Sequence, residues 1–194
     1  MNTILRRSVL GIAGLALSTG VVAGPLAADN TTTTPTTSMP ADSAVAVSVA
    51  QAAKPDMDTL IPHGTQGEQS RISLGDEQTA NVKAIIEAKP QNVAIATSLQ
   101  ESKLENLGHL GDRNDHDSQG LFQQRPSSGW GTVEQITDPE YSTTAFLKGL
   151  QQVEGWQDMP LTKAAQTVQV SAYPFHYAQW ETQAADLVAE HWTS

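Results

Sequence analysis

The composition of the chain changes near residue 70, and this change limits where a hydrophobic core can form. Residues 28–70 are rich in Thr, Ser, Ala and Pro, and residues 31–38 read TTTTPTTS. Large apolar side chains are too few there to offset the entropy lost on ordering. We therefore predict a disordered linker over residues 28–70, either a plain spacer or an O-glycosylated stalk. The folded domain is then expected in residues 71–194, and a chain of 194 residues favours a single domain.

The first 27 residues have the pattern of a secretory signal peptide. Arg6 and Arg7 precede an apolar run over residues 9–23, and small residues close the run at 21–23 and 25–27. The run is too short and too rich in glycine for a membrane span, so an uncleaved anchor is the weaker alternative. The paired arginines match a twin-arginine signal only in part, so we expect ordinary secretion. The protein is then secreted or associated with the cell envelope, with no stable membrane span after cleavage.

Cysteine content and charge exclude several classes of protein. The chain has no cysteine, which rules out disulfides, thiolate metal sites and a lipoprotein anchor. Its formal net charge of -10 argues against nucleic-acid binding, which needs a basic patch. The same charge gives no long-range attraction to an anionic cell wall.

The pattern of residues 71–194 predicts a mainly α domain of about five or six short helices. Asp76 is a candidate cap for the first of them, and Thr132 with Gln135 forms a capping box. Asp138 followed by Pro139 marks another helix start. The expected helices span residues 76–88, 90–102, 132–135, 138–150, 162–170 and 174–192, with a long polar loop over 103–118.

Glu101 is the residue of chemical interest, because it ends the apolar helix predicted over 90–102. The negative end of the helix dipole and partial burial would both raise the pKa of a carboxyl group placed there. A carboxylic acid kept protonated near neutral pH is what a glycosidase needs to protonate a leaving oxygen. Taken alone, a Glu at a helix end is more often an ordinary solvated side chain.

Three short motifs in a fixed order carry a family resemblance. Gln100-Glu101-Ser102 is followed by residues 118–123 (SQGLFQ) and later by residues 171–174 (SAYP). This order resembles the catalytic domain of soluble lytic transglycosylases and goose-type lysozymes, in the lysozyme-like superfamily, over about residues 73–192. Residues 120–126 and 129–131 also resemble a group of exported actinobacterial proteins with such a domain.

The resemblance implies a role for each matching position. Glu101 would be the general acid and base, and Tyr173 would direct its hydroxyl at Glu101 and orient it. Ser102, Ser118 and Gln123 would contact substrate in a sugar groove. The family has an Asn where this chain has Pro174, which offers neither an amide nor an N–H, so whatever that Asn does is lost or moved.

The acidic loop after Glu101 allows three interpretations. Asp112, Asp115 or Asp117 could be the second carboxylate of an inverting hydrolase, roughly 6.5–9.5 Å from the acid. If no aspartate faces Glu101, a single-carboxylate transglycosylase mechanism is the better choice. The loop could instead bind a hard cation, since residues 115–120 match half of a calcium loop, although Pro126 stands where the closing Glu belongs. It could also be a solvated turn.

Trp130, between two glycines, is predicted either to stack on a sugar or to plug the core. The leading hypothesis is an exported, monomeric enzyme that cleaves the β-1,4 glycan strands of peptidoglycan, as a lytic transglycosylase or a muramidase. The alternatives are a wall-binding module that keeps the fold without turnover and an envelope protein that binds cations through residues 112–117. We predict no cofactor and no metal in the leading case.

Overall fold

A computed structural model describes residues 54–89 and 91–192, and the structural statements below concern these residues. The predicted signal peptide, residues 28–53 of the predicted linker and Pro90 at the predicted start of a helix lie outside the described residues.

The described residues form a mainly helical domain with no β-strand, so the mainly α prediction is confirmed. Gln119 and Gln124 make one isolated antiparallel bridge. The α-helices are α1 Met57–Leu60, α2 Asp76–Ala88, α3 Asn92–Ser102, α4 Val133–Ile136, α5 Pro139–Gln151, α6 Leu161–Gln169 and α7 Glu181–His191. Four short 3₁₀ turns join them: η1 Gly111–Arg113, η2 Pro126–Ser128, η3 Trp156–Asp158 and η4 His176–Trp180.

Local capping signals explain where several helices begin. The Thr132 side chain accepts a hydrogen bond from the Gln135 N–H, and the Gln135 side chain accepts one from the Thr132 N–H, as the capping box predicts. Asp138 caps α5 by accepting from the N–H of Tyr141 at 2.6 Å. Asp76, by contrast, is not the cap of α2: it is the first helical residue after Gly75, where its charge suits the helix dipole.

The helix predicted over residues 174–192 is two elements in the structure. The tighter turn η4 comes first, and α7 begins only at Glu181. The Pro174 carbonyl accepts a hydrogen bond from the Thr162 hydroxyl at 3.0 Å, so it is held by α6 rather than by a helix of its own. The periodic apolar pattern continues through both elements, which is why sequence alone joined them.

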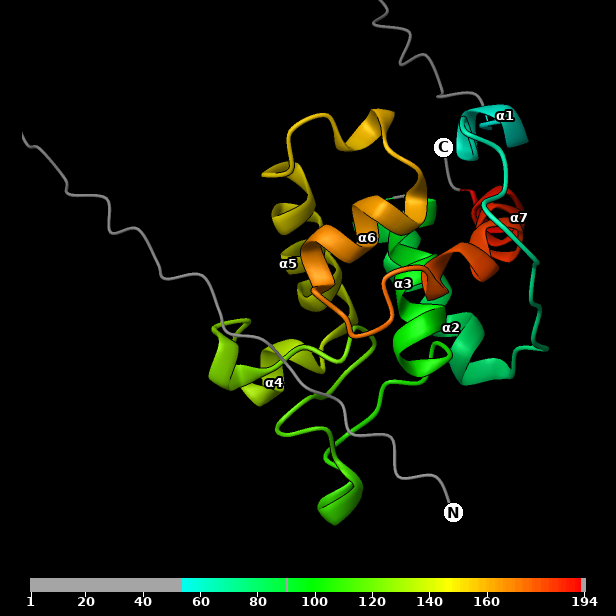
Figure 1. Ribbon diagram of the computed structural model, residues 1–194. Coiled ribbons are helices and arrows are strands. Elements are labelled where there is room, and N and C mark those ends of the chain that lie inside the picture. The colour runs from blue at the N-terminus through cyan, green and yellow to red at the C-terminus, as the bar shows by residue number, and fades with distance from the viewer. Residues whose placement is uncertain (1–53, 90, 193–194) are drawn as a thin grey trace, which may run out of the picture. The chain divides into compact units, whose positions relative to one another are not determined.

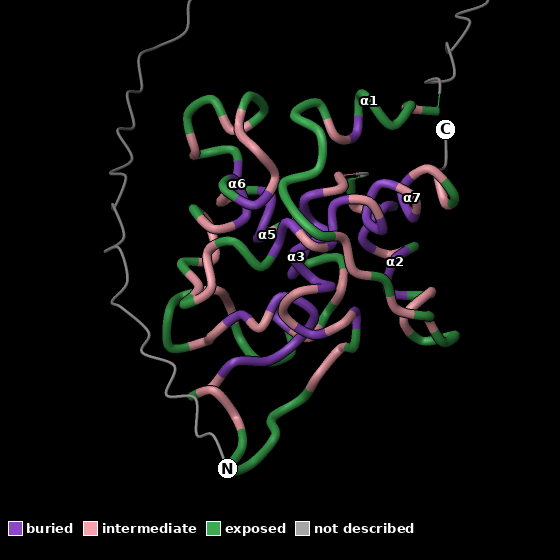
Figure 2. Tube along the Cα trace, turned by 45° about the vertical axis from the view of Figure 1, so that its right-hand side comes forward, coloured by how far each residue is buried: buried purple, intermediate pink, exposed green. Residues whose placement is uncertain are grey.

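Helix α3 lies at the centre of the domain (Figure 1), packed against α2, α5, α6, α7 and η4. Residues 93–99 are buried without interruption, as the tube coloured by burial also shows (Figure 2). A helix that is apolar on all sides belongs in a core. The end of α3 emerges from this core next to the loop of residues 104–130 (Figure 1).

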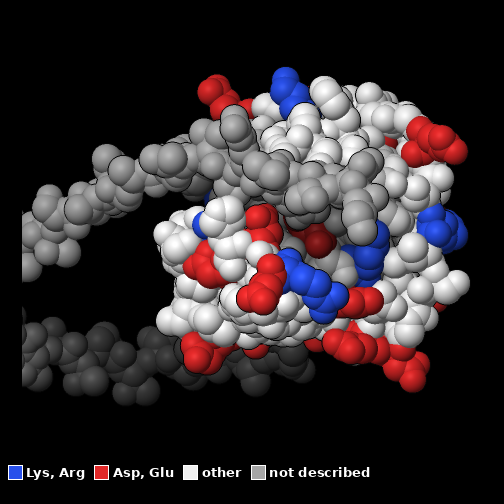
Figure 3. Space-filling model, turned by 60° about the horizontal axis from the view of Figure 1, so that its bottom comes forward, with Lys and Arg blue, Asp and Glu red and all other residues white. Residues whose placement is uncertain are grey.

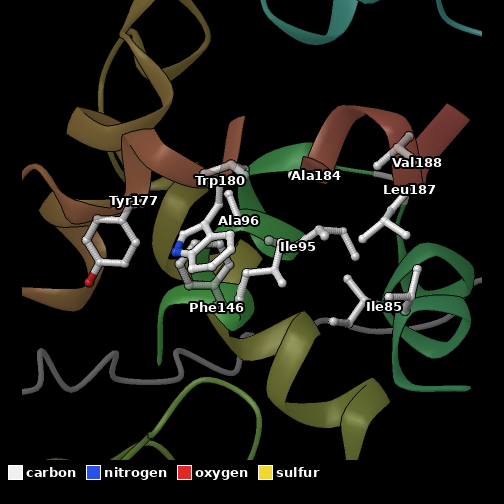
Figure 4. Close-up of a cluster of buried hydrophobic side chains, with 14 of the residues drawn as sticks. Ile85, Ile95, Ala96, Phe146, Tyr177, Trp180, Ala184, Leu187 and Val188 are labelled. Atoms are coloured by element: carbon white, nitrogen blue, oxygen red, sulfur yellow. The ribbon is translucent and has the colours of Figure 1, made fainter. Parts of the chain in front are cut away.

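The core consists of apolar side chains from α2, α3, α5, η4 and α7. Ile95 and Ala96 of α3 lie between Ile85 of α2 and the residues of η4 and α7 in Figure 4. Phe146 of α5 stacks on Phe122, with ring centroids 5.1 Å apart. This stack ties the turn that contains Phe122 to the core.

Residues 66–72 form an ordered strap along η4 and α7. The Ser70 N–H donates to the Gln179 carbonyl at 2.7 Å, and the Gln69 side chain bonds both the Ala178 carbonyl and the Thr182 N–H, each at 2.9 Å. Within the predicted linker, residues 57–60 therefore form α1, and residues 69 and 70 are bonded to η4 and α7. The strap is held by polar groups rather than by buried apolar side chains, so composition gave no sign of it.

Candidate active site

The end of α3 places Glu101 in a pocket of about 100 Å³, which we call the Glu101 pocket. Its walls come from three segments: the end of α3, the loop over residues 115–125 and the end of α6 with the segment after it. The lining residues are Glu101, Asp115, Ser118, Phe122, Gln123, Arg125, Gln169, Val170, Ser171, Ala172 and Tyr173. The face seen in Figure 3 is hollowed, with acidic atoms inside the hollow and side chains of both charges on its rim.

Tyr177 holds the Glu101 carboxyl group from inside the domain. Its hydroxyl donates to Glu101 Oε1 at 2.6 Å, while its ring is fully buried. In Figure 4 the ring lies at one end of the apolar cluster with its oxygen directed away from the labelled core residues. A buried ring with one fixed hydroxyl gives the half-buried Glu101 side chain a defined orientation.

Turn η4 also holds the residue before Glu101. Gln100 Oε1 accepts hydrogen bonds from Gln179 Nε2 at 3.0 Å and from the Trp180 indole N–H at 2.9 Å. Together with the Tyr177 bond, these contacts fix the last turn of α3 against η4. We refer to this set of contacts as the η4 clamp.

Lys103 places a positive charge beside Glu101. It ends α3 in the left-handed conformation, its Nζ donates to the Leu99 carbonyl at 3.0 Å and lies 4.6 Å from the centre of the Trp180 ring. Burial lowers the pKa of Lys103, and the Glu101 charge acts in the opposite direction. The sequence pattern places Glu101 at the negative end of a helix dipole. In the structure, the Lys103 ammonium group donates to one of the carbonyl groups at that end.

Ser102 joins α3 to the turn over residues 119–124. Its hydroxyl donates to the Leu121 carbonyl at 2.8 Å and is buried, so it positions the turn below the pocket and does not line the pocket. Gly120 is required in this turn, because its φ is +75° and a Cβ there would lie 2.0 Å from the Ile136 carbonyl oxygen. The structure thus brings the first two sequence motifs together.

Ser118 and Gln123 both line the Glu101 pocket, where the sequence placed them. Gln123 has a φ of 48°, and its side-chain amide donates to the Gly120 carbonyl at 3.1 Å. This bond holds the amide in the turn while its residue forms part of the pocket wall. Ser118 is buried, with its carbonyl bonded by the Asn114 side chain at 3.0 Å.

The three aspartates of the loop have different positions. Asp115 lines the Glu101 pocket and lies 3.0 Å from Nδ1 of His116. Asp112 is exposed on η1 and is not part of the pocket wall. Of the three candidate second carboxylates, Asp115 is the one that shares the pocket with Glu101.

Asp117 clamps its loop to the residues after the turn. It accepts from Arg125 Nε at 3.0 Å and from the Ser127 N–H and hydroxyl at 2.7 and 2.8 Å. Burial raises the pKa of Asp117, but these hydrogen bonds outweigh it and lower the pKa to about 2. A carboxylate engaged in this way supports the loop rather than activating water.

The order of acidic residues that matches half of a calcium loop does not produce a cation site in the structure. Within residues 54–89 and 91–192, no group of three or more His, Asp or Glu side chains is placed to hold a metal ion. The Asp115 carboxylate contacts His116, and the Asp117 carboxylate accepts from Arg125 and Ser127. The geometry therefore gives the cation-binding hypothesis no support.

Tyr173 and Trp130 have separate surroundings. Tyr173 lines the Glu101 pocket and stacks on His176, with ring centroids 4.7 Å apart. The Trp130 ring packs towards Gly149 of α5, 3.8 Å from where a Cβ would stand, and is not part of the pocket wall. Pro174, the departure from the family pattern, also lies outside this wall and lines a neighbouring cavity.

Sequence reasoning missed Tyr177, Lys103 and Arg125 as members of this site. The helical spacing of Tyr177 with Trp180 and Ala184 is typical of core residues, and the Tyr177 ring is buried. The one available signal was that Tyr173 and Tyr177 are four residues apart, so that both can lie on the same side of a helical segment. Nothing in the sequence says that the Tyr177 hydroxyl reaches Glu101.

Comparison with known proteins gives no family for this chain. No family model matches it, and no curated protein matches it. In the described ranges, no helix is both long enough and apolar enough to cross a membrane.

Proposed function

We propose that the protein is an exported enzyme of the lysozyme-like superfamily that cleaves the β-1,4 glycan strands of peptidoglycan, with Glu101 as general acid and base. The observation that carries this proposal is a half-buried carboxyl group with one oxygen fixed by a buried tyrosine hydroxyl, in the wall of a polar pocket. The order of motifs in the sequence, which resembles lytic transglycosylases and goose-type lysozymes, supports the same function.

Glu101 would act twice in the reaction. Its carboxyl proton would pass to the glycosidic oxygen as the bond to the anomeric carbon breaks, and the resulting carboxylate would then accept a proton from the attacking group. Tyr177 holds Oε1, so the carboxyl group meets the glycosidic bond in one orientation. Gln123 and Ser118 supply polar groups at the pocket wall for the hydroxyl and N-acetyl groups of the sugar.

Two reactions differ in the attacking group. In a muramidase, Asp115 rather than the Glu101 carboxylate would accept the proton of the attacking water, Glu101 would act only as the acid, and the product would have a reducing end. In a lytic transglycosylase, the hydroxyl of the sugar itself attacks, and the product has an anhydro end. Asp115 lines the same pocket as Glu101, which gives the hydrolytic reaction a second carboxylate.

The N-terminal sequence supports a location outside the cytoplasm. The signal pattern of residues 1–27 would direct export, and the Thr/Pro-rich residues that follow would separate the domain from its point of attachment or exit. The partner is then the glycan of the cell wall, acted on by a monomer.

The test is release of soluble fragments from purified peptidoglycan by the chain without residues 1–27. Glu101→Gln removes the acid and is expected to abolish the release of fragments. Glu105→Gln, an exposed position in the loop after α3, is expected to leave the release intact. Equal melting temperatures of the variants would exclude unfolding as the cause. Mass spectrometry of the fragments distinguishes anhydro ends from reducing ends.

The wall-binding module is the competing outcome of this test. Binding to peptidoglycan without release, unchanged by Glu101→Gln, would refute the enzymatic proposal and favour the module. The loss of the family's Asn at Pro174 and the net charge of -10 both favour the module. Because Pro174 lies outside the wall of the Glu101 pocket, it does not weigh against turnover there.

A further inference from the structure

A second cavity of about 380 Å³ lies on the other side of the segment over residues 171–175. Ser171, Ala172 and Tyr173 line the Glu101 pocket, and the next two residues, Pro174 and Phe175, line this second cavity. We call it the Phe175 cavity. A ligand that fills the Glu101 pocket therefore has the Phe175 cavity directly beside it, across one short stretch of chain.

The walls of the Phe175 cavity are mostly apolar. Pro160, Pro174, Phe175 and Ala178 line it, and Phe175 is 77% exposed, the most exposed large apolar side chain of the described domain. An aromatic ring held in water next to a cavity is a mark of a binding surface, since its burial by a ligand is favourable. Two proline residues and an alanine offer a surface that suits small aliphatic groups.

Four polar residues also line the cavity within the described part of the chain: Gln66, Thr162, Lys163 and Gln166. Lys163 is the only charged side chain among the residues that line it within the described part of the chain, and it is positive in a protein of net charge -10. Gln166 lines the cavity as well. Its Nε2 donates to the Ser171 carbonyl at 2.9 Å, whereas its Oε1 is buried and has no hydrogen-bond partner. The cavity thus offers a cation, which suits a carboxylate, whereas the buried Gln166 Oε1 is not accessible to a ligand.

The segment between the two cavities is fixed in place. Gln166 bonds the Ser171 carbonyl, and the Thr162 hydroxyl bonds the Pro174 carbonyl at 3.0 Å. Both bonds come from α6, whose residues also form the floor of the Phe175 cavity. The spacing between the Glu101 pocket and the Phe175 cavity is therefore set by the fold and does not depend on a bound ligand.

We propose that the Phe175 cavity binds the short acidic peptide stem that branches from the peptidoglycan glycan, while the glycan itself lies in the Glu101 pocket. A stem of this kind carries alanine methyl groups, peptide N–H groups and free carboxylates. The methyl groups match Phe175 and the proline walls, and a carboxylate matches Lys163. The inference rests on the proposed function, because that function places the glycan beside the cavity.

The experiment compares one glycan in two forms: strands with their peptide stems, and strands from which an amidase has removed the stems. Phe175→Ala and Lys163→Glu are tested in the chain without residues 1–27, with Val133→Ala and Lys148→Glu as exposed controls on α4 and α5. We expect each test variant to raise KM for the stem-bearing strands about three- to tenfold, with kcat little changed. Cleavage of the bare strands should stay as in the wild type.

Two results would overturn the inference. If the variants match the wild type on both substrates, the cavity plays no part in binding. If they slow cleavage of bare and stem-bearing strands equally, the cavity contacts sugar, as an aromatic ring stacked on a hexose would, and not peptide.

Failure of the proposed function is recognised separately. If the wild type cleaves neither form, isothermal titration calorimetry with a synthetic L-Ala–γ-D-Glu–L-Lys tripeptide tests the inference without any need for turnover. Binding that is lost in Lys163→Glu and kept in Lys148→Glu supports a peptide site in a protein without turnover. No binding by the wild type refutes the peptide site.

Discussion

Replacing Gln69 by alanine tests whether the strap over residues 66–72 belongs to the folded domain. The Gln69 side chain donates to the Ala178 carbonyl and accepts from the N–H of Thr182, both at 2.9 Å. Thr182 is the second residue of α7, and its N–H is one of those that a helix cannot satisfy internally. Trp180, the residue before α7, supplies no side-chain cap. Gln69 therefore caps α7 from a distant part of the sequence.

The magnitude follows from these two bonds. Losing a helix cap costs about 1 kcal/mol, and losing the second bond, to the Ala178 carbonyl that then keeps only the Glu181 N–H, costs about as much again. We expect Gln69→Ala to lower the free energy of unfolding by about 2 kcal/mol. For a domain of this size that is a decrease in Tm of roughly 6–10 °C.

The assay is urea unfolding followed by tryptophan fluorescence and far-UV circular dichroism, with Gln152→Ala as the control. Gln152 is an exposed residue at the end of α5, so its replacement should change the unfolding free energy by less than about 0.5 kcal/mol. If Gln69→Ala is as stable as this control, the strap does not hold α7 and the reasoning is wrong.

Four further outcomes are expected. If Glu101 is the proposed acid, Tyr177→Phe should slow glycan cleavage about ten- to hundredfold without unfolding the domain, because a hydrogen bond to the Glu101 carboxyl group is lost; unchanged turnover would contradict the proposed positioning role of Tyr177. The pKa of Asp117 is lowered to about 2 in the folded state, so the wild type should lose stability as the pH falls from about 4 to about 2, and Asp117→Asn should lack this loss in acid titrations of stability. Gly120→Ala should cost about 3 kcal/mol or more in urea unfolding, since its Cβ meets a backbone oxygen, whereas Gly155→Ala, with a similar φ of +66° and open space around it, should cost only about 1 kcal/mol. Burial raises the pKa of Glu181 above its ordinary 4.5, although a hydrogen bond from the Gln66 N–H acts in the opposite direction. The stability of the wild type should therefore decline as the pH rises from 4.5 through the folded-state pKa. Glu181→Gln should remove that decline, and an unchanged pH profile would refute this reasoning.

Most helix positions could be predicted because their signals are local. Thr132 caps α4 through residues three positions away, and Asp138 caps α5 in the same way. The apolar run before Glu101 predicted a buried helix, and residues 93–99 are buried. The strap was missed because its partners are more than a hundred residues distant in sequence, and polar side chains reveal such pairings neither by composition nor by period.

Some residues that line the Glu101 pocket could be identified from the sequence, but the side chains that they contact could not. Glu101, Ser118, Gln123 and Tyr173 line one pocket, as the order of the motifs led us to expect. The choice among the aspartates depends on the path of the loop, where His116 has a φ of 57°. A backbone reversal of that kind decides which carboxylate faces the pocket and which faces Arg125, and sequence spacing does not contain that information.

The five residues of turn η4 hold two different segments of the domain in place. Ala178 and Gln179 hold the strap by their carbonyl groups, while Tyr177 and Trp180 hold the end of α3 by their side chains. A substitution in η4 therefore changes stability and the site together, and a change on one side needs a compensating change on the other. Among homologous sequences, substitutions in the strap and at the end of α3 should therefore be correlated through η4. None of the contacts described above joins the strap to α3 directly. This turn should consequently evolve more slowly than the other short turns of the described domain.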